Sequence, residues 1–201
     1  MSAAPIDFWF DFSSPYSYIA SHWIEPLAVR HGRTVRWHAM LLGATFKAAE
    51  LRPPSSYPVK GPYMLRDFAR SARLEGVAFS MPDPFPIPTQ NAARIFWWLE
   101  SQDPARAAAW VRAGLAAYFA RNVRLNDMTA LKALAAEVGV DPDAAEAACG
   151  DERWKSKLIG VNENALRQGI FGAPTIVVDG EPFWGNDRRA QIERWLASGP
   201  F

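Results

Sequence analysis

The chain has 201 residues, of which 49% are apolar, and its 22 basic and 21 acidic residues leave a net charge of +1. This length and composition suffice for one domain, or for one domain that carries an insertion. The balanced charge argues against a nucleic-acid-binding face and against a polybasic membrane-binding surface. No apolar run approaches the roughly 20 residues that a membrane span needs, so no membrane partner is expected.

The number of cysteines and the sequence near Met1 indicate the cellular compartment of the protein. Cys149 is the only cysteine, so no disulfide can form within the chain, and its apolar neighbours predict a small core residue. The sequence enters a predicted strand within a few residues of Met1, which argues against a secretory signal peptide. We therefore expect a cytoplasmic protein. His22, His31 and His38 lack the spacing of metal ligands, so no metal site is expected.

The first structured segment predicts a strand followed directly by a helix. Ile6–Phe10 is apolar at nearly every position, as expected for a buried strand. Ser14 is a favoured N-cap type, and Pro15 is tolerated at the first helical position. Helical spacing of apolar residues then predicts one helix from Pro15 to about Arg30. Ser14 fits an ordinary helix cap, and its place at the positive end of a helix also makes it a candidate anion-binding residue.

A second strand and a long helical region come next. Thr34–Leu41 alternates between apolar and polar residues, which predicts a strand and completes a βαβ unit. Residues 43–61 show no regular period and contain Lys47, which is either a solvated lysine or a cation for a carboxylate ligand. Helices are predicted through residues 62–169, apart from a proline-dense segment at 81–88. Their expected starts are Pro62, Thr89 or Gln90, Asp103-Pro104, Asp127, Asp141-Pro142 and about Glu152.

Strand patterns return at the carboxyl end. Ala173–Asp179 and Glu181–Trp184 predict two strands joined by a tight Asp-Gly turn. A final helix is expected through Leu196, with Asn186 or Asp187 as its cap. The order βαβ, helical insertion, ββα predicts an α/β protein of thioredoxin-like architecture with a large all-helical insertion. Its domains are expected to be a discontinuous thioredoxin-like domain, residues 1–45 and 170–201, and a helical insertion domain, residues 46–169.

Four segments in combination resemble one family. They are Phe10–Tyr18 (FDFSSPYSY), Val161–Glu163 (VNE), Gly169–Thr175 (GIFGAPT) and Phe183–Arg188 (FWGNDR). Together they are similar to the 2-hydroxychromene-2-carboxylate isomerases, a family close to kappa-class glutathione transferases and to DsbA-like thioredoxin folds. The likeness spans the whole chain. It implies a thioredoxin-like fold of the DsbA type and glutathione as cofactor.

The resemblance also implies roles for particular residues. Ser14 corresponds to the serine that holds and activates the glutathione sulfur. Pro174 corresponds to the cis-proline of thioredoxin folds, and Ala173 offers its backbone to the cysteinyl part of glutathione. The aromatic substrate is expected near Lys47 and Phe85. The segment that receives the γ-glutamyl end consists of Trp184, Gly185, Asn186 and Asp187.

The implied reaction interconverts 2-hydroxychromene-2-carboxylate and trans-o-hydroxybenzylidenepyruvate, a step of aromatic (naphthalene-type) catabolism, and the implied assembly is a homodimer. Two alternatives keep glutathione: a kappa-class-like transferase that conjugates electrophiles, and a non-catalytic glutathione-binding protein. Disulfide exchange is not expected, because Ser14-Pro15-Tyr16-Ser17 stands where a redox protein has Cys-x-x-Cys. A serine hydrolase is not expected either, because no Gly-x-Ser-x-Gly motif surrounds Ser14.

Overall fold

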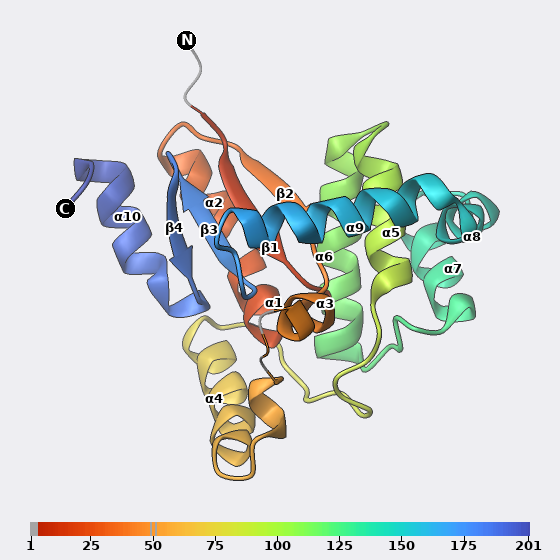
Figure 1. The fold of residues 1–201 in the computed structure, drawn as a ribbon, viewed down its shortest axis with the longest axis horizontal. Coiled ribbons are helices and arrows are strands. Elements are labelled where there is room, and N and C mark those ends of the chain that lie inside the picture. Colours follow the sequence, from red (N-terminus) through yellow and green to blue (C-terminus); the bar gives the residue numbers. More distant parts are fainter. Residues whose placement is uncertain (1–3, 49, 51) are drawn as a thin grey trace.

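A four-stranded sheet forms the centre of one half of the molecule (Figure 1). The computed structural model describes residues 4–48, 50 and 52–201. The strands β1 (Ile6–Phe10), β2 (Val35–Ala39), β3 (Thr175–Val178) and β4 (Glu181–Trp184) lie in the order β2-β1-β3-β4. β1 pairs parallel with β2 and antiparallel with β3, and β3 pairs antiparallel with β4. The predicted thioredoxin-like α/β architecture is therefore confirmed, with strands from the amino-terminal and carboxyl-terminal parts of the chain paired in one sheet.

Helices make up most of the remaining described chain, and α5 to α8 form a bundle beside the sheet (Figure 1). α9 contacts β2 and α5, so it joins the sheet to this bundle. The helices are α1 (Pro15–Ser21), α2 (Ile24–Arg30), α3 (Leu42–Ala48), α4 (Lys60–Leu74), α5 (Gln90–Glu100), α6 (Pro104–Arg121), α7 (Met128–Glu137), α8 (Pro142–Gly150), α9 (Glu152–Arg167) and α10 (Arg189–Ser198). Single 3₁₀ turns lie at Pro54–Ser56 and Asn186–Arg188.

The predicted aspartate caps begin their helices. The side chains of Asp103, Asp127 and Asp141 each accept a hydrogen bond from a backbone N–H in the first turn of α6, α7 and α8. These N–H groups have no partner within the helix, so a carboxylate at the cap satisfies them. Short polar residues before a helix are a local signal, which is why the sequence locates these three starts well.

The predicted helix from Pro15 to Arg30 is wrong as one element, because it is two helices, α1 and α2, separated at His22 and Trp23. Pro26 explains the break: it has no N–H to donate to the carbonyl of His22, and its ring crowds that carbonyl. α1 is therefore only two turns long, and the dipole available at Ser14 is smaller than a 16-residue helix would give.

Two other elements differ from the sequence patterns. α3 lies in the segment for which no regular structure was predicted, and β2 is shorter than the predicted strand Thr34–Leu41. The expected capping of the last helix by Asn186 or Asp187 is wrong. A 3₁₀ turn takes up both residues, and α10 follows Arg188 without a side-chain cap.

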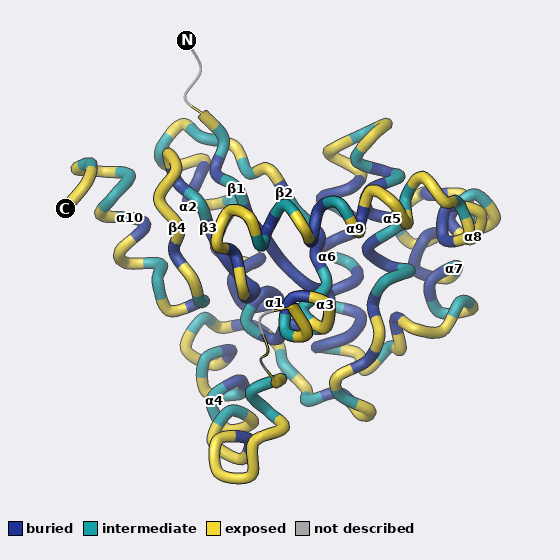
Figure 2. The backbone as a smooth tube through the Cα atoms, viewed as in Figure 1, coloured by how far each residue is buried: buried dark blue, intermediate teal, exposed yellow. Residues whose placement is uncertain are grey.

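The buried core runs continuously from the sheet into the helical part (Figure 2). The ring of Phe10 on β1 packs edge-on against Phe96 of α5 at 5.6 Å between centroids, and against Phe12 at 5.2 Å. The indole N–H of Trp97 donates to the carbonyl of Ala39 at the end of β2, at 3.0 Å. The sheet and the helical segment thus share one core, and the division at residues 45 and 170 stays a prediction.

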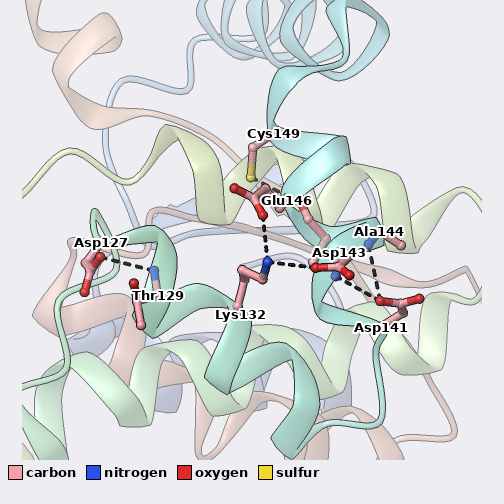
Figure 3. A network of polar contacts seen from close by, with 9 residues as sticks. Asp127, Thr129, Lys132, Asp141, Asp143, Ala144, Glu146 and Cys149 are labelled. Carbon is pink, nitrogen blue, oxygen red and sulfur yellow. Dashed lines mark hydrogen bonds and ion pairs between the residues drawn. The ribbon is translucent and has the colours of Figure 1, made fainter.

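Ion pairs link α7 and α8 on the outside of the helical bundle (Figure 3). Lys132 donates to Asp143 and to Glu146, each at 2.7 Å. Such exposed pairs contribute little to stability individually. Cys149, on the same helix as Asp143 and Glu146, is buried, as predicted, and burial raises the pKa of its thiol to about 11. Among the helices of the described chain, none is long and apolar enough to span a membrane.

A polar cluster borders the sheet at β1 and β2. The carboxylate of Asp7 contacts His38 Nε2 at 2.7 Å and Arg36 Nη2 at 2.9 Å, and the His38 ring stacks on Trp9 at 4.3 Å. Burial alone would raise the pKa of Asp7, but the hydrogen bonds and charges of His38 and Arg36 outweigh it and lower this pKa to about 2. The ionised carboxylate is therefore favoured by the folded state.

Asp7→Asn tests this pair. Because the pKa of Asp7 is depressed in the folded state, its contribution to stability is complete above about pH 4 and is lost as the pH falls through about 2. We expect the variant to lose about 1–2 kcal/mol of unfolding free energy at neutral pH, less than the full shift because solvent screens the pair. Chemical denaturation at several pH values measures it, with the exposed Glu137→Gln as control. A difference that stays constant between pH 4 and 2 would contradict the assignment.

Candidate active site

Ser14 lies where β1 ends and α1 begins, and its side chain is buried at 3% exposure. Its hydroxyl donates to the carbonyl oxygen of Ala173 at 2.9 Å and accepts a hydrogen bond from the backbone N–H of Ser17 at 3.1 Å. The predicted cap is therefore present. The same side chain also joins two segments that are 159 residues apart in the chain.

The loop before β3 completes the other side of this contact. The Ala173–Pro174 peptide bond is cis. The carbonyl of Pro174 accepts a hydrogen bond from the N–H of Gly185 at 2.9 Å, which ties the loop to the residues after β4. Within the described chain, no residue accepts a hydrogen bond from the N–H of Ala173. This N–H is consequently available to a ligand with a peptide-like backbone.

Two glycines shape the segment after β4. Gly185 has a φ of +112°, and a Cβ on it would run into the carboxylate of Asp187. A Cβ on Gly172 would clash with Nε1 of Trp184, whose half-exposed ring also packs on Phe171 at 4.9 Å. Only glycine leaves room for the positions that the indole and the carboxylate adopt here.

Asn186 and Asp187 differ in what they leave open to a ligand. The side chain of Asn186 is buried, and its Oδ1 accepts a hydrogen bond from the indole N–H of Trp23 at 2.8 Å. Asp187 is exposed and pairs with Arg188 at 2.9 Å. Asn186 therefore has a structural role through its side chain, whereas the carboxylate of Asp187 is accessible.

A buried carboxylate underlies the Ser14 loop, and the sequence patterns missed it. Asp11 is 2% exposed. Its Oδ1 accepts from the N–H and hydroxyl of Ser13 and from the hydroxyl of Thr89, at 2.7, 2.9 and 2.9 Å, and its Oδ2 accepts from the N–H of Leu42 at 2.6 Å. Burial raises the pKa of Asp11, against the lowering effect of these hydrogen bonds. One side chain thus connects the Ser14 loop to the starts of α3 and α5.

An aromatic row extends from α1 toward Phe85. The phenol of Tyr16 donates to Asp67 on α4, and its ring packs on Phe68 at 5.0 Å between centroids. Phe68 in turn contacts Phe85 at 6.2 Å. Burial, the hydrogen bond to Asp67 and, more weakly, the charge of Asp187 raise the pKa of Tyr16, so its phenol stays protonated.

The structure brings together most of the residues predicted for the site. Ser14, Ala173, Pro174 and the segment from Trp184 to Asp187 form one connected region through the contacts above. Phe85 reaches it through the aromatic row. Lys47 lies exposed on α3, the helix whose first residue, Leu42, donates its N–H to Asp11. In the described ranges, no group of three His, Cys, Asp or Glu side chains is arranged to hold a metal ion.

The fold defines a thioredoxin-like protein of the DsbA type, and Ser14 stands at the start of its first helix. A model of the DsbA-like thioredoxin domain matches residues 5–197. The chain belongs to this domain family and, within it, to the 2-hydroxychromene-2-carboxylate isomerase family, as the resemblance implied.

Three similar proteins support this placement. The chain is 31% identical to 2-hydroxychromene-2-carboxylate isomerase of Sphingobium xenophagum over 193 residues, 95% of this chain and 97% of that protein. It is 31% identical to glutathione S-transferase kappa 1 of Caenorhabditis elegans, covering 91% of this chain and 86% of that protein. A solved 2-hydroxychromene-2-carboxylate isomerase superposes with a TM-score of 0.86 at 28% identity, over 96% of this chain and 94% of that structure.

Asp11→Asn tests the role of the buried carboxylate. In the asparagine variant, one carboxylate oxygen becomes an NH₂ group. This NH₂ would face the backbone N–H of either Leu42 or Ser13, so two donors would meet and one would lose its acceptor. We therefore expect a loss of about 1–3 kcal/mol of unfolding free energy, measured by urea denaturation. Asp127→Asn is the matched control, because Asp127 accepts one hydrogen bond, from the N–H of Thr129 at 3.1 Å, and asparagine caps helices about as well. Similar small losses in both variants would show that Asp11 does not hold the loop together.

Proposed function

We propose that this protein is a glutathione-dependent isomerase that interconverts 2-hydroxychromene-2-carboxylate and trans-o-hydroxybenzylidenepyruvate. One observation carries the proposal: the start of α1 carries a serine, and the chain's one cysteine thiol lies elsewhere. Ser14 occupies this position, and the lone Cys149 is buried in α8 with its Sγ against the carbonyl of Ala145. The names of the relatives support an isomerase, and a thiol from outside the chain would supply the missing nucleophile.

The chemistry requires a good nucleophile that is also a good leaving group. A bound thiolate would add reversibly to the conjugated C=C bond of the ring-opened substrate, which permits rotation about that bond before the thiolate leaves. Because a free thiol has a pKa near ~8.5, the residues around it must favour the ionised form at neutral pH.

Ser14 is the residue that we assign to this task. In the glutathione-free structure, the Ser14 hydroxyl donates its hydrogen bond to the carbonyl of Ala173. When glutathione binds, the hydroxyl would donate to the sulfur instead, while the hydrogen bond from the N–H of Ser17 keeps the hydroxyl oxygen in place. A hydrogen bond donated to the charged form lowers a pKa. Because α1 is short, this hydrogen bond rather than the helix dipole is expected to dominate.

The neighbouring groups fit a tripeptide thiol. The N–H of Ala173 would pair with the cysteinyl backbone beside Pro174, and the exposed carboxylate of Asp187 would accept the γ-glutamyl ammonium group. The half-exposed ring of Trp184 would cover the backbone between them. Asn186 would contribute through its main chain, since its side chain is bound to Trp23.

The substrate would lie on the α3 and α4 side of the sulfur. The row from Tyr16 to Phe85 offers a flat aromatic surface, and Lys47 offers a cation for the substrate carboxylate. We also propose a cytoplasmic homodimer. The single cysteine supports the compartment, and exposed apolar side chains on and before α4, among them Val59 and Tyr63, support the dimer.

A kappa-class-like transferase is the second candidate, and the 31% identity to glutathione S-transferase kappa 1 favours it. The two activities would use the same thiolate and differ in the fate of the adduct. An isomerase regenerates free glutathione in each cycle, whereas a transferase consumes it. The glutathione concentration during turnover therefore separates them.

Ser14→Ala tests the assigned role. We expect the pKa of bound glutathione to rise by one to two units, which lowers turnover at neutral pH about ten- to hundredfold, with partial recovery at higher pH. The ultraviolet absorbance of the bound thiolate, titrated against pH, reports the shift directly. Loss of the cap should also remove about 1 kcal/mol of stability.

Ser17→Ala is the control for that experiment. Ser17 is fully buried on the same helix, and its hydroxyl has no hydrogen-bond partner in the described chain, so its removal should leave both stability and the thiolate titration nearly unchanged. Identical titrations for the wild type and Ser14→Ala would contradict the role of Ser14 and assign thiol activation to another group.

A further inference from the structure

Asp187, the residue assigned to the γ-glutamyl group, lies in a short turn that is anchored on both sides to one buried indole. The turn is the 3₁₀ segment Asn186–Arg188, and α10 begins directly after it at Arg189. On one side, Oδ1 of Asn186 accepts a hydrogen bond from Nε1 of Trp23 at 2.8 Å. On the other side, the guanidinium of Arg189 lies over the Trp23 ring, at 5.9 Å from its centroid. Asp187 thus sits between two contacts to the same buried side chain.

An ion pair holds Arg189 in this place. Its Nη1 donates to Oε2 of Glu75 at 2.6 Å, and Glu75 directly follows the last residue of α4. The side chains of Arg189 and Glu75 are 38% and 19% exposed, whereas those of the ion pair between Arg30 and Glu193 are 48% and 46% exposed. Solvent therefore screens the pair at Glu75 less, so this pair fixes the arginine more firmly over the indole.

α4 is also tied to the other end of the proposed glutathione site. The phenol of Tyr16, two residues after Ser14, donates to Asp67 in the middle of α4. This helix stands apart from the bundle of α5 to α8 (Figure 1). It therefore links the segment that carries Ser14 to the turn that carries Asp187, and it contacts each of them two residues after the residue assigned to the ligand.

The place of the Asp187 carboxylate depends on this anchoring. The residue is exposed, and within the described chain its one ion pair is with the neighbouring Arg188, at 2.9 Å. A pair between neighbours in the sequence moves with the turn and does not fix it. A hydrogen bond to an ammonium group is strong only over a narrow range of distance and angle, so a turn that shifts loses part of that contact. Recognition of the γ-glutamyl end therefore requires that the turn itself be held.

We propose that Arg189 and Glu75 are positioning residues for glutathione, because together they fix the turn that presents Asp187 to the γ-glutamyl ammonium group. The inference rests on the proposed function, since it takes glutathione as the ligand. Both residues act through Asp187, so their effect is confined to the ammonium end of the tripeptide. The cysteinyl part, which is assigned to Ser14 and Ala173, is bound by other segments and does not depend on them.

Calorimetric titration with glutathione and with glutaryl-cysteinylglycine, which is glutathione without its ammonium group, tests the proposal. Arg189→Gln should weaken glutathione binding about tenfold and leave binding of the glutaryl analogue unchanged. Glu75→Gln, which removes the charge and leaves Arg189 in the chain, should act in the same direction. In an Asp187→Ala background, Arg189→Gln should have no further effect on glutathione binding, because the group that it positions is gone.

Arg30→Gln is the matched control, because Arg30 also fastens α10, through its ion pair with Glu193 at 2.9 Å, but joins that helix to α2. Its affinity for glutathione should equal that of the wild type. Glu75→Gln decides the question if Arg189→Gln folds poorly. Unchanged glutathione binding in the variants at Arg189 and Glu75, or an equal loss for glutathione and the glutaryl analogue, would overturn the inference and leave the proposed function standing. A wild type that does not bind glutathione would overturn both.

Discussion

The carboxylate of Asp11 is the contact on which the candidate site depends. It is buried, and it accepts hydrogen bonds from its own loop, from the first residue of α3 and from Thr89 before α5. A carboxyl group in such surroundings is tolerated because both of its oxygens accept hydrogen bonds from nearby donors. Without it, the loop that carries Ser14, the start of α3 and the start of α5 would lose their common anchor.

Next to this carboxyl group, Ser14 joins two segments that are distant in the sequence. The hydroxyl of Ser14 and the carbonyl of Ala173 join the first strand–helix connection to the loop before β3, and Gly185 binds the same loop from its other side. The strand–helix connection at Ser14 and the segment from Ala173 to Gly185 are thereby held together, with the half-exposed Trp184 beside them. A buried hydroxyl with two hydrogen bonds is well placed to exchange one acceptor for another, which is what thiol activation would require.

Local sequence signals predict the strands, the helix caps and the site motifs, whereas the elements that the sequence did not predict depend on tertiary contacts. The strands, the aspartate caps and the site motifs could be located because residue type and spacing act over a few positions. The break before Pro26 follows a local rule that the apolar periodicity concealed. α3 could not be predicted, since its first N–H depends on Asp11, a residue that is distant in sequence.

The proposed mechanism requires glutathione to supply the nucleophilic thiol that the site lacks. The most direct measurement is the isomerisation rate of 2-hydroxychromene-2-carboxylate with glutathione, with S-methylglutathione and with neither. S-Methylglutathione keeps the cysteinyl backbone and the γ-glutamyl ammonium group but has no ionisable thiol, so it should support no turnover and should inhibit competitively against glutathione. Turnover at the full rate without glutathione, or with the S-methyl analogue, would contradict the account.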